Sequence, residues 1–281
     1  MSDFVQQQHT ACDFSSSDAW VILSPIEQSI KRKIEALGTP LKDWDIQINY
    51  GIKTGFNDAF IISTEKRNEI LANCKDADER ERTAELIRPI LRGRDIKRYG
   101  YDWANLWLIA TFPSRHYDID KYPSVKQYLL SFGIERLEQT GITHIVNGEK
   151  VKARKKTNNK WFETQDSISY WEDFYKPKLF YADITQQLNF CFCSEVMFCN
   201  NTTYFIATEN ELILEHLNKF LNSPLIDWYY RTLSVQLGEK AVRMFSIYVL
   251  EIPIPPMGQN DIYKAYSLSA SEIEYIENRE V

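Results

Sequence analysis

The chain has 281 residues, a net charge of −6 and five cysteines, and these values exclude several classes of protein. The acidic balance excludes binding of nucleic acid through total charge, so any such site has to depend on local basic patches. An odd number of irregularly spaced cysteines without a secretory signal favours reduced thiols in the cytoplasm. No apolar run approaches the ~18 residues that a membrane span requires.

The first part of the chain is a polar stretch followed by a predicted helix. Residues 1–18 contain QQQ and SSS runs and are expected to form a linker or a frayed end. Ser24, Pro25 and Glu27 then form an N-cap, first-turn and capping-box set, and the apolar stripe after them predicts a helix that ends at Gly38.

A glycine-bearing loop follows the first predicted strand. Residues 44–50 place apolar side chains on one face, and in the next segment, GIKTG, Gly51 and Gly55 bracket Lys53 and Thr54. Glycine allows a positive φ or a close approach to a ligand at such positions. The segment lacks the GK[ST] ending of a phosphate loop and opens no helix, so it does not predict a nucleotide site. Residues 58–62, which come next, are expected to form a short strand.

A second glycine-bearing loop, ILRGRDIKRY, follows two predicted helices at 64–73 and 75–88, the second of which is expected to end at Pro89. Its cations surround Gly93, with Asp95 as the single acid. They are Arg92, Arg94, Lys97 and Arg98. This cluster suits an extended polyanion, and arginine adds planar forks that match phosphate or guanine edges. A solvated loop beside a basic helix end has the same composition, since charge runs are usually solvated faces.

The middle of the chain contains its most basic segment. A buried strand at 106–110 and a helix at 122–139, interrupted near Gly133, are predicted first. Residues 149–160 then carry six cations and one acid. The cations are Lys150, Lys152, Arg154, Lys155, Lys156 and Lys160. With the aromatic residues after it, this segment fits a loop that follows a phosphate backbone, and it fits a solvated excursion equally well.

The last third is predicted to be rich in short strands and then helical. Runs at 178–181, 189–193, 196–199 and 203–206 predict a meander, with Asn200 and Asn201 in a turn. Amides there can bridge the turn or reach adenine in a major groove, and the turn role is favoured. Two amphipathic helices start at Glu211 and Ser223, and a loop with Lys240 and Arg243 precedes the closing run 247–254.

The chain lacks the motifs of enzymes that modify or cut DNA. Neither an NPPY-like tetrapeptide nor a glycine-rich cofactor loop is present, so we expect no S-adenosylmethionine site. Asp95 and Lys97 have the final spacing of a PD-(D/E)xK nuclease, but no Pro-Asp pair lies suitably upstream. The thiols at 191, 193 and 199 are expected to be buried in strands, because no CxxC pair or histidine completes a zinc site. We therefore expect no catalytic residue, cofactor or metal in this chain.

Seven segments occur in collinear order: WVILSP, LKDWDIQINYGIKTGFNDAF, IRPILRGRDIKRY, YKPKLFYADIT, MFCNNTTYFI, LNSPLIDWYYR and VLEIPIPP. Together they resemble the TaqI-like C-terminal specificity domain. That domain is the DNA target-recognition part of type IIG restriction-modification enzymes and of related adenine-N6 methyltransferases. The resemblance covers roughly residues 20–256 and is weakest in the basic segment 149–160.

The resemblance implies an α+β fold, with mixed curved β-sheets, an N-terminal helix and a C-terminal helical pair. It implies a linker at 1–18, a DNA target recognition domain at 19–256 and an extension at 257–281. The implied function is sequence-specific recognition of double-stranded DNA in a type II restriction-modification system. The chain would not be an enzyme by itself, since other domains or subunits would supply adenine-N6 methylation or cleavage, with their S-adenosylmethionine and Mg²⁺.

The resemblance also implies roles for the polar residues of these loops. Lys53 occupies the position of a base-reading cation, with Thr54 and Asn57 as neighbouring donors and Asn201 as a further candidate. Phosphate contacts are implied for Arg92, Arg94, Lys97, Arg98, Lys152, Arg154, Lys155, Lys156, Lys240 and Arg243, with one arginine of the second loop reading guanine. Two alternatives stay open: a protein-interaction or inhibitor module of a bacterial defence system, and a hydrolase dependent on Asp95.

Overall fold

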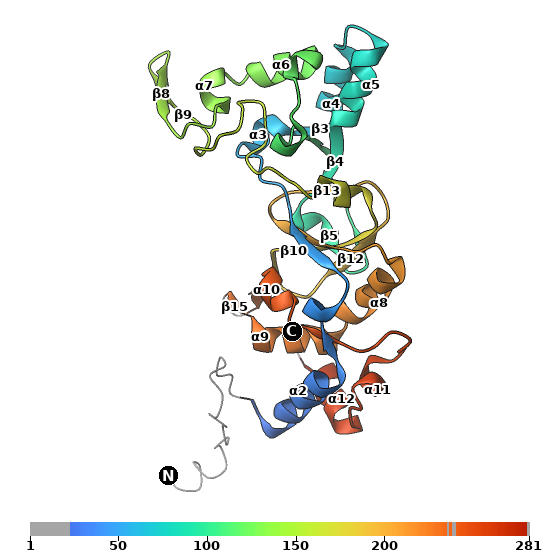
Figure 1. Cartoon of the computed structure of the whole chain (residues 1–281). Helices are drawn as coiled ribbons and strands as arrows, with labels where there is room; N and C mark the ends of the chain where they lie inside the picture. The colour runs from blue at the N-terminus through green and yellow to red at the C-terminus, as the bar shows by residue number, and fades with distance from the viewer. Residues whose placement is uncertain (1–22, 235, 238–239, 280–281) are drawn as a thin grey trace. The chain divides into compact units, whose positions relative to one another are not determined.

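The computed structural model describes residues 23–234, 236–237 and 240–279, so the predicted linker at 1–18 lies outside the described residues. The chain forms two compact units, whose elements are labelled in Figure 1. The helical unit contains residues 23–46, Ile184–Asn189 and the described residues from 215 on. The sheet unit contains Gln47–Asp183 and Phe190–Leu214. Helices and short strands occur in both, which confirms the predicted α+β class.

The helical unit combines helices with strands of two or three residues. Its elements are α2 (Pro25–Leu37), β1 (Thr39–Pro40), η1 (Leu41–Asp43), β11 (Ile184–Thr185), α9 (Pro224–Leu233), β15 (Gln236–Leu237), β16 (Ala241–Arg243), α10 (Ser246–Val249), β17 (Pro253–Ile254), α11 (Ile262–Ala265) and α12 (Ala270–Glu277). Helix α8 (Glu211–Leu221) begins in the sheet unit and ends in this one. β1 pairs with β17, and β16 lies between β11 and β15. The helices α8 and α9 are the predicted C-terminal pair.

Helix α2 forms where local chemistry predicts it. Ser24 accepts from the Glu27 N–H, and the Glu27 carboxylate accepts from the Ser24 N–H at 2.8 Å, which completes the capping box. Ile30 and Ile34 are fully buried on one face. The helix ends before Gly38, where a Cβ would lie 2.7 Å from the Pro253 Cβ. The predicted start and end of this helix are therefore confirmed.

A buried carboxylate links α12 to α2. Glu272, which is 4% exposed, accepts from the Ser29 hydroxyl and from the Lys33 ammonium group, both at 2.7 Å. Burial alone would raise the pKa of Glu272, but hydrogen bonds from Lys33, Ser269 and Ser29 lower it to about 2. The ionised form of this residue therefore contributes to the stability of the helical unit.

The sheet unit is larger and contains most of the aromatic core. Its strands are β2 (Gln47–Tyr50), β3 (Ile61–Ser63), β4 (Ile87–Leu91), β5 (Ile96–Lys97), β6 (Gly100–Tyr101), β7 (Leu106–Ile109), β8 (Thr143–Val146), β9 (Glu149–Lys152), β10 (Lys178–Ala182), β12 (Phe190–Cys193), β13 (Phe198–Cys199) and β14 (Thr203–Ala207). Its helices are α3 (Asn57–Phe60), α4 (Thr64–Ala72), α5 (Ala77–Leu86), η2 (Gly93–Asp95), η3 (Pro113–Arg115), η4 (Ile119–Lys121), α6 (Pro123–Leu130), α7 (Ile134–Leu137) and η5 (Trp171–Tyr175).

Two four-stranded sheets organise this unit. One has the order β12-β10-β14-β2 and is antiparallel, with every residue of β10 buried. The other has the order β13-β4-β7-β3, in which β13 runs parallel to β4. Phe174 packs between them, with its ring centroid 4.5 Å from that of Phe198 and 4.7 Å from that of Phe205. Aromatic packing of this kind buries a large apolar area for each residue.

Several sequence predictions for this unit are wrong. The predicted meander is not formed, because β10 lies between β12 and β14, and β13 pairs with β4 in the other sheet. Most of the strand expected at 58–62 is α3, and only its last residues belong to β3. Helix α5 ends at Leu86, and Pro89 lies inside β4, opposite Trp107 of β7. The predicted strand at 106–110 and the helix break near Gly133 are confirmed by β7, α6 and α7.

The three thiols at positions 191, 193 and 199 are buried in strands, as predicted. Cys191 and Cys193 lie in β12 and Cys199 in β13, each at most 3% exposed. Burial raises the pKa of Cys191 to about 12, so this group stays a thiol at neutral pH. Within the part of the chain that the structure describes, no group of three or more His, Cys, Asp or Glu residues is placed to hold a metal ion. None of the described helices has the length and apolar character needed to cross a bilayer.

We predict that Glu272→Gln lowers the free energy of unfolding by about 1–3 kcal/mol at pH 7. The pKa of Glu272 in the folded protein lies below its ordinary value, so its contribution is present above about pH 4.5 and is lost as the pH falls toward 2. Urea unfolding at pH 7 and at pH 3 measures this. Glu274→Gln, on an exposed position of the same helix, is the control. An equal loss at both pH values would contradict the assignment.

Candidate nucleic-acid interface

Two loops of the sheet unit, residues 51–55 and 92–95, bond to a third loop, the turn at residues 200–202. We call this arrangement the three-loop junction. At its first contact, Gly51 donates to Thr203 O and Ile52 donates to Cys199 O, both at 2.8 Å. Asn201 donates in return to Ile52 O at 3.0 Å. A Cβ on Gly51 would lie 1.9 Å from Asn200 O, so only glycine fits there.

The same turn also holds the second loop. Asn200 donates from its backbone to Leu91 O at 2.9 Å, and Gly93 donates to the Thr202 hydroxyl at 2.8 Å. That hydroxyl donates to the Asn200 side-chain oxygen at 2.6 Å. A Cβ on Gly93 would lie 2.5 Å from Thr202 O. Asn200 therefore has the turn role that the sequence favoured, and the turn fixes the two predicted DNA-contacting loops relative to each other.

The first loop presents Lys53 and buries Thr54, and Asn57 is exposed at the start of α3. The Lys53 ammonium nitrogen lies 5.0 Å from the ring centroid of Tyr50, and the residue is exposed. Thr54 is 1% exposed, and its hydroxyl donates to the Asn57 side-chain oxygen at 2.7 Å. Thr54, which was predicted as a donor to DNA, is therefore buried, and its hydroxyl group instead positions the exposed Asn57.

An aromatic ladder that the sequence analysis did not identify supports Lys53. The ring of Tyr50 contacts Tyr204 at 4.7 Å between centroids, and Tyr204 stacks on Tyr181 at 5.3 Å with an interplanar angle of 7°. The Tyr50 hydroxyl donates to Asn201 O. The alternation of apolar and polar side chains in residues 44–50 predicted that Tyr50 lies on one face of a strand. It could not identify the partners of Tyr50, because they lie more than 130 residues away in the sequence.

In the second loop one cation is partly buried and ion-paired, and the others are exposed. Arg92 forms a bidentate pair with Asp95, at 3.1 Å from Nε to Oδ2 and 2.8 Å from Nη2 to Oδ1. This hydrogen bonding raises the pKa of Arg92. Asp95 is 4% exposed, so its carboxylate is committed to structure. Arg94 and Arg98 are exposed, and neither makes an ion pair with a described carboxylate.

The strands β5 and β6 pair as a short hairpin that presents Arg98. Lys97 pairs with Gly100, which leaves Arg98 and Tyr99 at the turn, and Tyr99 has a φ of 65°. The Lys97 ammonium nitrogen lies 3.9 Å from the Asp102 carboxylate, and both side chains are more than half exposed. An ion pair this exposed is weak, so Lys97 can readily exchange Asp102 for another anion. Arg94, Lys97 and Arg98 are thus the accessible cations of this loop.

Arg154, predicted to clamp a phosphate backbone, lies in the interior. It is 2% exposed, and its guanidinium group donates to four backbone carbonyls: Leu137 at 2.6 Å, Thr54 at 2.9 Å, Glu163 at 2.7 Å and Trp161 at 2.6 Å. Burial lowers its pKa to about 10, so it remains charged at neutral pH. We correct its assignment to a structural one, because a guanidinium committed to these carbonyls is not available to DNA.

Unlike Arg154, the lysines of the basic segment are exposed. Residues 143–152 form the hairpin β8–β9, which the sequence did not predict, and it carries Lys152. Lys155 and Lys156 follow it and are exposed. Through its bond to Thr54 O, Arg154 attaches the base of this segment to the first loop. The structure thus connects the basic segment to the three-loop junction.

Lys240 and Arg243 belong to the helical unit. Lys240 is exposed, and its carbonyl accepts from Arg231 at 2.9 Å. Arg243 lies in β16 with its guanidinium carbon 4.8 Å from the ring centroid of Phe245. Asn201 is partly buried, and both its backbone groups are used in the junction. A role of these three side chains in binding stays a prediction.

A family model described as the TaqI-like C-terminal specificity domain matches residues 88–254. The chain belongs to this family. The family prediction made from collinear motifs is confirmed, although the match begins inside the third motif and leaves the first two outside it. The specificity domain therefore includes the second and third loops of the junction, while the loop with Lys53 precedes the matched range.

The solved structures that match this chain include two restriction-modification enzymes. One is the type IIG restriction endonuclease BpuSI, with 12% identity and a TM-score of 0.54 over 90% of this chain and 28% of that chain. Another is the type IIL restriction-modification enzyme MmeI in complex with DNA, with 14% identity and a TM-score of 0.42 over 81% and 27%. The chain thus spans 28% of the length of BpuSI. No curated protein matches the sequence.

We predict that Arg154→Lys destabilises the sheet unit by about 3 kcal/mol or more, because one ammonium group cannot reach four separate carbonyls and leaves buried acceptors unpaired. Lys155→Ala and Lys156→Ala, at neighbouring exposed positions, should change stability by less than about 0.5 kcal/mol. Urea denaturation followed by tryptophan fluorescence measures all three. Equal effects at the three positions would show that Arg154 is not a structural residue.

Proposed function

We propose that this specificity domain recognises a specific sequence in double-stranded DNA and positions the duplex for adenine-N6 methylation or cleavage by other domains or subunits. Membership of the family is the observation that carries the proposal. It is supported by the three-loop junction, because loops held by backbone hydrogen bonds and close glycine contacts present their side chains with little freedom. S-adenosylmethionine and Mg²⁺ would be bound by the catalytic parts.

Local charge supports a polyanionic partner. The whole chain has a net charge of −6, yet the exposed cations of these loops make no ion pair with a described carboxylate within 4.0 Å, apart from the 3.9 Å pair of Lys97. They are Lys53, Arg94, Lys97, Arg98, Lys152, Lys155 and Lys156. Paired arginines such as Arg92 instead stabilise the fold. Exposed cations without a carboxylate partner are the groups through which an acidic protein can contact phosphates.

The proposal assigns different roles to the two loops. Lys53, held over the Tyr50 ring in the loop that precedes Asn57, is proposed to read a base edge in the major groove. Arg94, Lys97 and Arg98 are proposed to contact phosphates and set the register of the duplex. Lys152, Lys155 and Lys156 would extend the phosphate contacts, and Lys240 and Arg243 would add them from the helical unit.

Selection of duplexes from a randomised pool, by the chain alone and within its full-length parent, tests this function. Enrichment of one sequence is expected. We predict that Arg98→Ala then weakens binding to all sequences. It should also make the dependence of the log association constant on the log salt concentration less steep by about one unit. Lys53→Ala should relax preference at one base pair, by about 1–3 kcal/mol.

Lys126→Ala is a matched control, because this lysine is paired with Asp120 at 2.5 Å and lies outside the junction. It should leave both affinity and sequence preference unchanged. If no sequence is enriched in either context, the DNA function fails and a protein-interaction role is favoured. If Lys53→Ala and Arg98→Ala weaken all sequences equally, the division between base reading and phosphate contact is wrong.

A further inference from the structure

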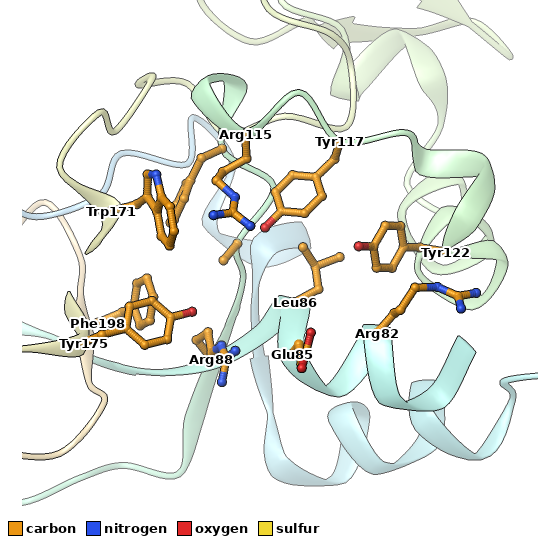
Figure 2. A pocket seen from close by; sticks show the side chains of 12 residues that line it. Arg82, Glu85, Leu86, Arg88, Arg115, Tyr117, Tyr122, Trp171, Tyr175 and Phe198 are labelled. Carbon is orange, nitrogen blue, oxygen red and sulfur yellow. The ribbon is translucent and has the colours of Figure 1, made fainter. Parts of the chain in front are cut away.

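A second cationic site lies at the other end of β4 from the three-loop junction. Arg88 is near the start of β4 and Arg92 follows its end, so the two are separated by roughly 13 Å along an extended strand. At the Arg88 end, helix α5, the loop after β7 and helix η5 enclose a pocket of about 100 Å³ (Figure 2). No sequence motif pointed to this pocket, because its residues are spread from position 82 to 198.

Two arginines on opposite walls of this pocket are oriented by aromatic rings. The guanidinium carbon of Arg115 lies 3.8 Å from the ring centroid of Trp171, and that of Arg88 lies 5.3 Å from the centroid of Tyr175. Figure 2 shows the Arg115 guanidinium directed into the pocket between Trp171 and Tyr117. Ring stacking fixes the plane of a guanidinium and leaves its N–H edges available for hydrogen bonds.

No carboxylate of the described residues forms an ion pair with the arginines of this pocket. Arg82, Arg88 and Arg115 line the pocket together with a single acid, Glu85, which gives a local balance of +2. The Nε atoms of Arg82 and Arg88 are buried without a hydrogen-bond partner. Buried donors of this kind usually have partners, so their lack of one points to a ligand that is absent from the protein alone.

The remaining lining suits a small oxyanion. Tyr117 and Tyr122 add hydroxyl groups, and burial raises the pKa of both, so they stay protonated and able to donate. A pocket of about 100 Å³ is too small for a nucleoside together with its phosphate, so only the phosphate group would enter. Fork-shaped donors on two walls match the oxygens of a tetrahedral phosphate.

We propose that this pocket binds a phosphate dianion, either free or as the terminal group of a phosphate monoester. Arg88 and Arg115 hold the oxygens from opposite walls, and Arg82, which also lines the pocket, adds positive charge. This binding is separate from the proposed DNA recognition, which uses the cations at the opposite end of β4. A phosphodiester within a duplex carries the chain on both sides of the phosphate and has only one negative charge, so it fits the pocket poorly.

Isothermal titration of the whole chain with inorganic phosphate, a nucleoside 5′-monophosphate and a 5′-phosphorylated oligonucleotide tests the proposal and distinguishes the sources. Saturable binding of at least one is expected. A monoester should bind several-fold more tightly at pH 7.5 than at pH 5.5, because its second proton is lost near pH 6. Sulfate, a dianion at both pH values, should show no such change.

Arg115→Gln is the principal variant, because Arg115 is exposed and the substitution should not impair folding. It should weaken binding of the phosphate ligand at least tenfold, and the double variant Arg88→Gln, Arg115→Gln should abolish it. Arg80→Gln, an exposed arginine of α5 outside the pocket lining, should leave it unchanged. Thermal unfolding confirms that each variant is folded.

The proposal is overturned if no phosphate ligand binds, or if binding is the same in Arg115→Gln as in the original chain. It is also overturned if Arg115→Gln weakens binding of duplex DNA and leaves phosphate binding unaffected, since the pocket would then belong to the DNA interface. Failure of the DNA selection with intact phosphate binding would remove the proposed function and leave this site standing.

Discussion

The turn at residues 200–202 is the constraint on which the candidate interface depends. Its backbone and the Thr202 hydroxyl bond to Leu91, Gly93 and Ile52, so two loops that are distant in sequence share one support. Close contacts at Gly51 and Gly93 leave no space for a side chain. Loops held in this way do not have to be ordered when a duplex binds, and the cost of ordering is a large part of what weakens an association.

Charge in this protein is used for two purposes. Arg92 and Arg154 are committed to Asp95 and to backbone carbonyls, where they stabilise the loops and connect the basic segment to them. Lys53, Arg94 and Arg98 are exposed and unpaired within the described residues. The proposed interface therefore combines arginines that hold the loops in place with exposed cations that are available to a partner. Because the overall charge is −6, contact with a polyanion depends on local groups of exposed cations such as these.

The sequence predicted those helices and strands whose ends are determined by residues close together in the chain. The capping box at Ser24 and Glu27 predicted α2, because both partners lie within one helical turn. Sheet order could not be predicted in this way, since β13 pairs with β4 across more than 100 residues. Composition did not separate Arg154 from its exposed neighbours, because burial depends on the segments that fold over it. The family was predictable because its motifs keep their order along the chain.

The most direct test of the three-loop junction as a DNA interface is hydrogen–deuterium exchange, measured with and without the duplex that the protein selects. Binding at the junction should slow exchange in residues 51–55, 92–95 and 200–202 together, while α12 in the helical unit stays unchanged. Protection of other segments, with unchanged exchange in all three loops, would contradict the account.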